Sequence, residues 1–299
     1  MKEISRNNII YEFKPEMESK KRVSPGEIVK FDANDAFNNQ IHSEEKTLNE
    51  VDFSKLNPAT GPIFIDGAEE GDILKVKILD ITVSKKGVIV TAPEAGVLGD
   101  MVKESKTKII EIEDGFCKFE GVKIPVKPMI GVIGVATEKE PYSTGTPWKH
   151  GGNMDTQDIC EGSTLYLPVK QEGALLALGD CHAVMGDGEV CVASCEINSE
   201  VTVKVDVIKN GDIEWPVVET EDEIMIITSG ESADKALRES TEQVVKSLSK
   251  GLDISWADAY LLASLCVDLR ISQIVDPKKT ARAAIPKTIL DSKRIIKRC

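Results

Sequence analysis

The sequence predicts a mainly β protein of the β-sandwich or jelly-roll type, with two helices near the C-terminus. Most of the chain alternates apolar and polar residues with a period of two, which is typical of half-buried strands. Turn residues bound these runs at short intervals, which favours a sandwich or jelly roll over a βαβ fold. We expect one domain over 1–299, β-rich in 1–229 and helical with a returning segment in 230–299.

The strand signal is strongest in two segments. Residues 72–83, DILKVKILDITV, alternate unevenly, and 200–209, EVTVKVDVIK, place four valines on one face. The other expected strands, in chain order, are an early strand near the N-terminus and 26–31, 87–92, 108–113, 116–126, 130–136, 163–169, 174–179, 189–197 and 223–228. The segments 40–60 and 93–106 are expected to be polar loops.

Two helices are expected after Ser229. The segment SADKALRESTEQVVKSLSKG has apolar residues at helical spacing, with Ser232 as the N-cap and Gly251 as the stop. A second helix is expected from Ser255, where Ser255 and Asp258 form a weak capping box. We expect these helices to brace the sheet or an oligomer contact rather than carry chemistry. The segment AAIPKTIL, which follows them, is a candidate returning strand.

Composition narrows the classes of partner. The net charge of -13 argues against nucleic acid and against an anionic membrane surface, both of which require clustered Lys and Arg. No segment approaches the roughly 20 apolar residues of a membrane helix. The seven cysteines show no CxxC pair, so a disulfide framework is not expected and a cytoplasmic location fits best.

The stretch GDCHAVMGDGEVC, residues 179–191, contains several side chains that can bind a metal or transfer a proton. Asp180 and His182 lie two apart, so both project from one face of an extended chain and can touch one ion. A mixed Asp, His and Glu set suits zinc or another divalent transition metal, whereas carboxylates alone suit calcium or magnesium. Glu189 is expected to open the next strand beside that ion, as general base. The alternative is a solvated acidic turn.

A second stretch, TPWKHGGNMDTQDI, places His150 before two glycines, with Asn153 and Asp155 close behind. The glycines permit a close backbone approach to a ligand, and their N–H groups are a candidate oxyanion hole. Upstream, FDANDAFNNQ offers Asp35 as a further metal ligand, although the segment fails as a calcium loop because the glycine and the distal Glu are missing.

Cys181 is a candidate nucleophile that these patterns disfavour. Its neighbours in sequence are Asp180 and His182, but adjacent residues of a strand point to opposite faces, so His182 cannot easily activate the thiol. Activation of water by a metal is therefore preferred, and the thiolate stays as an alternative.

Several stretches resemble the acetamidase/formamidase family. The most specific are TPWKHGGNMDTQDICEGSTLYLPV and GALLALGDCHAVMGDGEVCVASCEI, and the likeness extends to NPATGPIFIDGAEEGDILKVKILDI and CVDLRISQIVDP, in family order over nearly the whole chain. The resemblance implies a jelly-roll β-sandwich with added helices, hydrolysis of a short-chain amide to carboxylate and ammonia, bound divalent cations, and homo-oligomers, as dimers or higher. Carried onto this chain, it implies functional positions at Asp35, His150, Asn153, Asp155, Asp180, His182 and Glu189.

These observations combine into one hypothesis. A divalent metal, with zinc favoured and calcium as the alternative, is held by Asp180 and His182 with help from Asp155 and Asp35, and Glu189 serves as the base. The substrate is a small neutral amide, which Asn153 hydrogen-bonds. Two other functions stay open. One is a non-catalytic, cation-stabilised binding module, and the other is an amidase for a larger or cyclic C–N substrate.

Overall fold

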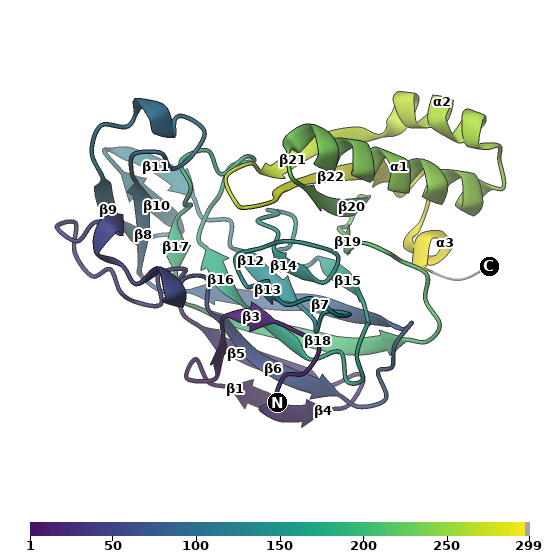
Figure 1. Cartoon of the computed structure of the whole chain (residues 1–299), viewed down its shortest axis with the longest axis horizontal. Coiled ribbons are helices and arrows are strands. Elements are labelled where there is room, and N and C mark those ends of the chain that lie inside the picture. Colours follow the sequence, from purple (N-terminus) through teal and green to yellow (C-terminus); the bar gives the residue numbers. More distant parts are fainter. Residues whose placement is uncertain (297–299) are drawn as a thin grey trace.

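A computed structural model describes residues 1–296 of the chain, and its elements are labelled in Figure 1. The first large sheet has the strand order β1 (Lys2–Ile4), β5 (Ile28–Ala33), β18 (Ser199–Ile208), β7 (Ile73–Val83), β15 (Thr164–Pro168), β19 (Val217–Glu219), β20 (Glu223–Gly230), β22 (Lys279–Pro286) and β21 (Asp268–Gln273). All of its pairs are antiparallel except β1 with β5.

The second large sheet carries the candidate site. Its order is β11 (Val122–Pro125), β10 (Phe116–Phe119), β9 (Lys106–Glu113), β8 (Lys86–Thr91), β17 (Glu196–Ile197), β16 (Leu176–His182), β12 (Met129–Gly134) and β14 (Gly151–Asn153). Off this path, β6 (Ala59–Ile65) pairs with β16, β2 (Ile9–Ile10) and β4 (Lys21–Val23), and a small separate sheet joins β3 (Glu12–Phe13) to β13 (Tyr142–Ser143). Short 3₁₀ turns are η1 (Leu48–Glu50), η2 (Phe53–Lys55) and η3 (Gly99–Met101).

The main core lies between these two sheets. Val203 and Phe31 on the first sheet belong to the same buried cluster as Ile133 and Leu178 on the second. The predicted alternation in β18 is confirmed, because its odd-numbered valines from 201 to 205 are buried whereas Thr202 is partly exposed and Lys204 is exposed. The expectation of a mainly β protein built from packed sheets is therefore confirmed.

The helices cover the far end of the first sheet, at the upper right of Figure 1. They are α1 (Ala233–Leu252), α2 (Trp256–Cys266) and a short α3 (Ser292–Ile296), which the sequence did not predict. A second buried cluster joins Val244 and Leu248 of α1 to Ile226 of β20 and Ile285 of β22. The predicted returning strand is β22, which covers the first half of AAIPKTIL.

Both predicted helix starts are confirmed, and the predicted stop of the first helix is wrong. Ser232 Oγ accepts the Lys235 N–H, and Ser255 Oγ accepts the Asp258 N–H. The first helix passes through Gly251 and ends at Leu252, and its C-cap residue, Asp253, adopts a left-handed conformation. Gly251 serves close packing instead, because a Cβ there would lie 2.6 Å from Leu290 Cδ1.

One predicted strand is largely wrong. Of the segment 189–197, only Glu196–Ile197 pairs, as β17, and the rest is an irregular connection after β16. Glu189 therefore lies in a turn and does not open a strand. Within EVCVASC, Ala193 and Cys195 are buried in clusters with Val88 of β8 and Ile110 of β9, whereas Val190 is exposed, so the apolar pattern does not correspond to a strand.

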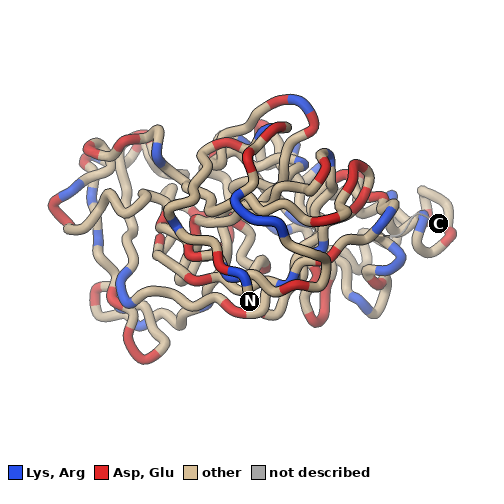
Figure 2. Tube along the Cα trace, turned by 90° about the horizontal axis from the view of Figure 1, so that it is seen from below, with Lys and Arg blue, Asp and Glu red and all other residues tan. Residues whose placement is uncertain are grey.

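Charged residues of both signs are interspersed along the trace in Figure 2, with no concentrated basic face in view. Among the described residues, no helix combines the length and the apolar character that a membrane crossing requires.

Candidate metal centre

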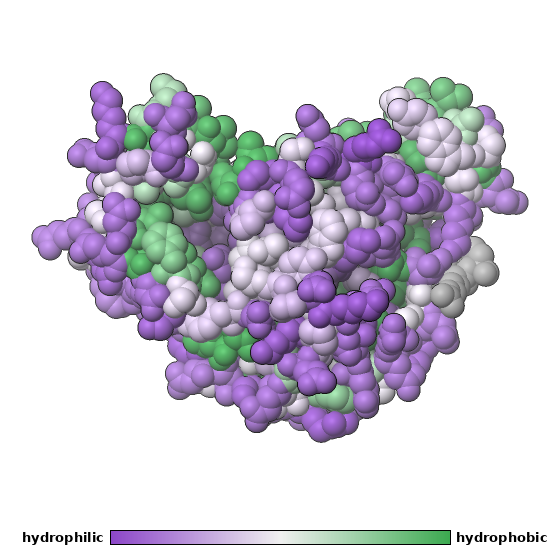
Figure 3. Space-filling model, in the orientation of Figure 1, coloured by the Kyte–Doolittle hydropathy of each residue, from purple (hydrophilic) through white to green (hydrophobic). Residues whose placement is uncertain are grey.

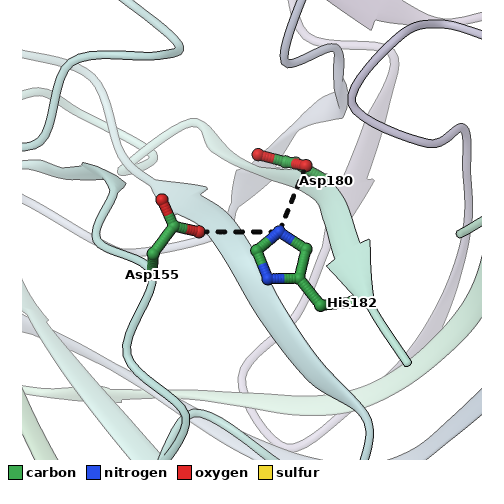
Figure 4. A group of neighbouring side chains, drawn as sticks. All are labelled: Asp155, Asp180 and His182. Atoms are coloured by element: carbon green, nitrogen blue, oxygen red, sulfur yellow. Dashed lines mark ion pairs between the residues drawn. The ribbon is translucent and has the colours of Figure 1, made fainter. Parts of the chain in front are cut away.

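Five titratable side chains meet at the end of β16, beside β12 and β14. His182 Nε2 is their centre: it lies 3.7 Å from Asp155 Oδ1, 3.6 Å from Asp180 Oδ1, 4.0 Å from Glu189 Oε1 and 3.2 Å from Glu196 Oε2. Figure 4 shows Asp155 and Asp180 directed at this nitrogen from two different segments. The predicted convergence of Asp180, His182 and Glu189 is therefore present.

The donor set fits a divalent metal. All five side chains are buried, and the carboxylate oxygens Asp155 Oδ1, Asp180 Oδ1 and Glu196 Oε2 have no hydrogen-bond partner in the described chain. Burying several carboxylates around one imidazole is costly unless a cation compensates them. Two ligand triplets bring their atoms within 4.8 Å of one another: Asp155, Asp180 and His182, and His182, Glu189 and Glu196. An imidazole with carboxylates matches the ligand preferences of zinc and related transition metals.

Neighbouring groups hold one oxygen each of Asp180, Glu189 and Glu196. Asn57 Nδ2 donates to Asp180 Oδ2 at 2.8 Å. Ser194 uses two donors, since its Oγ–H bonds Glu189 Oε1 at 3.1 Å and its N–H bonds Glu196 Oε1 at 2.7 Å. Supports of this kind orient metal ligands and fix which oxygen is presented.

The backbone is strained where the site is built. Asp155, Asp180 and Glu189 have positive φ values of 39°, 51° and 47°, a region that L-residues rarely adopt. Asp180 interrupts the regular conformation of β16, so its position beside His182 does not arise from a simple two-residue repeat. Gly131 on β12 makes room, because a Cβ there would lie 2.5 Å from Asp155 Oδ1 and 3.2 Å from His182 Nε2.

Burial dominates the electrostatics of the carboxylates. It raises the pKa of Asp155 and Glu189 well above their usual values, and the neighbouring carboxylates add to the effect. It also raises the pKa of Glu196, to about 7. For Asp180, burial acts in the same direction but is outweighed by His182, so the pKa is lowered. For His182, burial acts to lower the pKa, but Glu196 and Asp180 outweigh it and raise the pKa well above its usual value.

A small cavity of about 140 Å³ opens onto this cluster. Asn153, Asp180, His182, Glu189, Glu196 and Asp276 form its polar side. Its other side is apolar and comes mainly from the segment 36–56, with Phe37, Leu48 and Leu56, and from Val90 and Ala193. Part of the predicted polar loop is thus the apolar wall of a cavity.

Two predicted site residues lie elsewhere. His150 is buried between the rings of Phe13 and Tyr142, at centroid distances of 5.1 and 5.3 Å, and lines a separate cavity of about 360 Å³. The Gly151 N–H donates to Trp148 O, so it is not free as an oxyanion donor. Asp35 is buried and belongs to neither triplet, and its Oδ1 accepts the Asn39 N–H at 2.8 Å.

Cys181 lies as predicted, with its thiol directed away from His182. It is fully buried in the core between the sheets, on the opposite side of β16 from His182, and burial raises its pKa to about 12. A thiolate at neutral pH is therefore strongly disfavoured.

The sequence analysis missed Glu196, Asp276 and Gly131. Glu196 lay within an expected strand and gave no signal of its own. Asp276 follows β21, where its backbone N–H donates to Gln273 Oε1, and its side chain accepts from Asn153 Nδ2 at 2.9 Å. Gly131 could have been found, because a glycine inside a strand pattern indicates a close approach.

Comparisons with known proteins identify relatives of this chain. A family model described as the Acetamidase/Formamidase family matches residues 2–144 and 138–292. The crystal structure of a predicted acetamidase/formamidase from Thermoanaerobacter tengcongensis is 45% identical, with a TM-score of 0.95 over 98% of both chains. That of an acetamidase from Bacillus halodurans is 42% identical, with a TM-score of 0.94 over 96% of this chain and 97% of that chain.

Curated relatives are more distant. A putative formamidase of Schizosaccharomyces pombe is 26% identical in a match that covers 68% of this chain and 65% of that protein. The chain thus spans slightly less than two thirds of the length of the curated relatives that it matches.

Proposed function

The chain belongs to the acetamidase/formamidase family, and we propose on that premise that it hydrolyses small primary amides to carboxylate and ammonia. The observation that carries the proposal is the convergence of four buried carboxylates on His182 Nε2, at the floor of a small cavity. The B. halodurans structure is named an acetamidase, and the S. pombe relative a putative formamidase.

In this proposal Asp155, Asp180 and His182 hold a divalent ion, with zinc favoured by the mixed donor set and calcium as the alternative. Glu196, 3.2 Å from His182 Nε2, joins them as a further candidate ligand. Such an ion supplies Lewis acidity toward water and toward the amide carbonyl. The proposed ligand set does not include Asp35, because its Oδ1 accepts the backbone N–H of Asn39 and so stabilises a local turn.

Glu189 is the proposed general base. Its carboxylate lies at the cavity, beside the ligands, where it can accept a proton from the attacking water. The same group can return that proton to the leaving nitrogen. Ser194 holds Glu189 Oε1, so the base keeps a fixed direction through both transfers. The proposal assigns His150 no step, since it lines a different cavity.

Cavity size argues for a small substrate. About 140 Å³ lies well below the roughly 300–1,000 Å³ of pockets for drug-sized ligands, which disfavours a large or cyclic amide. The apolar wall suits a short alkyl group, and the polar side suits the carboxamide. The mixed His and carboxylate set disfavours a purely structural calcium in a non-catalytic binding module.

Replacement of the base tests this function. We expect Glu189→Gln to lower the release of ammonia from formamide and acetamide by about 10²–10⁴-fold while bound metal is unchanged, because only proton transfer is removed. Glu161→Gln, at an exposed position, is the matched control and should leave activity intact. Loss of metal in Glu189→Gln would make Glu189 a ligand instead, and full activity would refute its role as base. A wild-type protein that releases no ammonia from either amide would overturn the proposed function.

We also propose a homo-oligomer, assembled through α2 and β21. Trp256, Tyr260, Leu261, Leu265 and Leu269 are 48–83% exposed on this face, and Figure 3 shows the apolar surface over α2. An exposed apolar group of this kind indicates an interaction surface, and each partner of a stable interface contributes about 800 Å². Sedimentation should show that Leu265→Lys dissociates the oligomer whereas Leu98→Lys, at another exposed leucine, does not. A wild-type monomer would refute the proposal.

The state of the cysteines is related to the cellular compartment, because disulfides form in oxidising compartments. Cys117, Cys160, Cys181, Cys191, Cys195 and Cys266 are free thiols. Free thiols in this number support a reducing compartment, and we propose the cytoplasm.

A further inference from the structure

In the side-chain amide of Asn153, the NH₂ group has a hydrogen-bond partner and the carbonyl oxygen has none in the described chain. Its Nδ2 donates to Asp276 Oδ2 at 2.9 Å, whereas its Oδ1 is buried without a hydrogen-bond partner in the described chain. Both Asn153 and Asp276 line the cavity that contains Glu189 and His182. A buried acceptor without a donor is costly, so a ligand that donates a hydrogen bond at this point is favoured.

Asp276 determines which way this amide faces. The two ends of an asparagine side chain have nearly the same shape, so the neighbours decide its orientation. Asp276 Oδ2 accepts the Asn153 N–H whether or not the other oxygen of Asp276 carries a proton. The reversed amide would place two acceptors against each other. Asp276 therefore turns Asn153 Oδ1 away from itself.

The backbone position of Asp276 is fixed by hydrogen bonds to the side chain of Gln273. Gln273 is fully buried, and its Oε1 accepts the N–H groups of Val275 and Asp276 at 2.9 and 3.0 Å. Its Nε2 donates to Lys278 O and Thr280 Oγ1 at 2.7 and 3.1 Å. One side chain thus holds the loop between β21 and β22 with all of its hydrogen-bonding capacity in use.

We propose that Asp276 is a positioning residue that presents Asn153 Oδ1 to the nitrogen of the substrate, and that this pair selects unsubstituted carboxamides over esters. The inference rests on the proposed amidase function. A carboxamide NH₂ supplies the donor that the unpartnered Oδ1 lacks, and an ester of similar size supplies none. A site built around a hydrogen bond discriminates strongly against an analogue that cannot form it, by up to about 10⁴-fold.

The test compares acetamide with methyl acetate, with acid release as the readout for both. In Asp276→Leu the Asn153 amide loses its anchor, so we expect kcat/KM for acetamide to fall at least 30-fold while that for methyl acetate changes less than 3-fold. Asp276→Asn keeps an acceptor oxygen and should stay within 3-fold of the wild-type amide-to-ester ratio. Asp268→Leu, on the exposed start of β21, is the matched control.

Each outcome decides the matter. Equal losses for amide and ester in Asp276→Leu, or no loss, would overturn the positioning role. If that variant does not fold, Asn153→Ala, which removes the acceptor itself, must show the same loss of selectivity or the inference is wrong. If the wild-type protein hydrolyses neither compound, the proposed function fails separately. Ligand-observed NMR then decides: tighter binding of acetamide than methyl acetate, lost in Asp276→Leu, upholds the inference, and equal binding overturns it.

Discussion

Asp155, Asp180 and Glu189 are held in backbone conformations that cost an L-residue on the order of 1–3 kcal/mol each. Such conformations persist where the surrounding structure enforces them, and they concentrate at functional sites. Asn57 and Ser194 restrain two of these side chains, and Gly131 leaves the space that the cluster occupies. The geometry of the site is thus imposed on the chain by its neighbours.

His150 gives a prediction for stability. Burial lowers its pKa to about 3, so below about pH 6.5 the unfolded chain takes up a proton that the folded protein does not. This term is absent at neutral pH and destabilises the fold as the pH falls toward 3. Between pH 7.5 and 5 it should cost about 2 kcal/mol.

The measurement is urea unfolding of wild type and His150→Gln at both pH values. The wild type should lose about 2 kcal/mol more than the variant, because residue 150 of the variant takes up no proton and all other titrating groups are the same in both proteins. Parallel losses in the two proteins would show that His150 is accessible to protons when folded.

Residue patterns found part of the site. Asp180, His182, Glu189 and Asp155 could be predicted because the first three lie in one short polar stretch and the fourth follows a paired glycine. Glu196 and Asp276 could not be predicted. Glu196 was one position of an expected strand with no signal of its own, and Asp276 comes from a segment far away in the sequence. The positions of His150 and Asp35 depend on which neighbours pack against them, which the sequence does not reveal.

At the scale of elements, Arg282 on β22 holds the connection after β16 in place. Its Nη2 donates to both oxygens of Asp187 at 2.9 Å, and its Nε pairs with Asp158 Oδ2 at 2.7 Å. The side chain is almost fully buried. Next to it, the Gly188 N–H donates to Ser272 O. The loop that carries Glu189 is therefore attached to the C-terminal strands.

Removal of this attachment should be costly. We expect Arg282→Met to lower the free energy of unfolding by about 3 kcal/mol, because Asp158 and Asp187 lose a buried counterion. Arg270→Met on the neighbouring β21 removes a more exposed pair and should cost about 1 kcal/mol or less. Urea unfolding of both variants makes the comparison. A smaller loss for Arg282→Met than for Arg270→Met would contradict this interpretation.

Elements were predictable where local signals act alone. The starts of α1 and α2 follow from serine caps, and β7 and β18 from alternation. Prediction failed where packing decides. Gly251 lies inside a helix because the side chain of Leu290 packs against it and leaves no room for a Cβ. Apolar and polar residues alternate in 189–197, but most of this segment forms no strand. The mainly β class could be predicted because many short segments show the same alternation of apolar and polar residues.

At the scale of the whole molecule, the candidate site draws on segments far apart in sequence. Asn57 and Asp155 lie near the sheet that carries His182, and Asp276 arrives from the C-terminal strands. The helical and returning segment therefore contributes to the site, beyond the bracing role expected for its helices. The expectation of one domain over 1–299 stays a prediction, and a shared site accords with it.

The central claim is a buried metal centre that hydrolyses small amides. The most direct measurement is ammonia release from formamide and acetamide by the purified protein as isolated, after chelation, and after addition of zinc. We expect activity that disappears when elemental analysis shows that the metal has been removed and that returns with zinc. Undiminished activity in protein shown to be metal-free would contradict it.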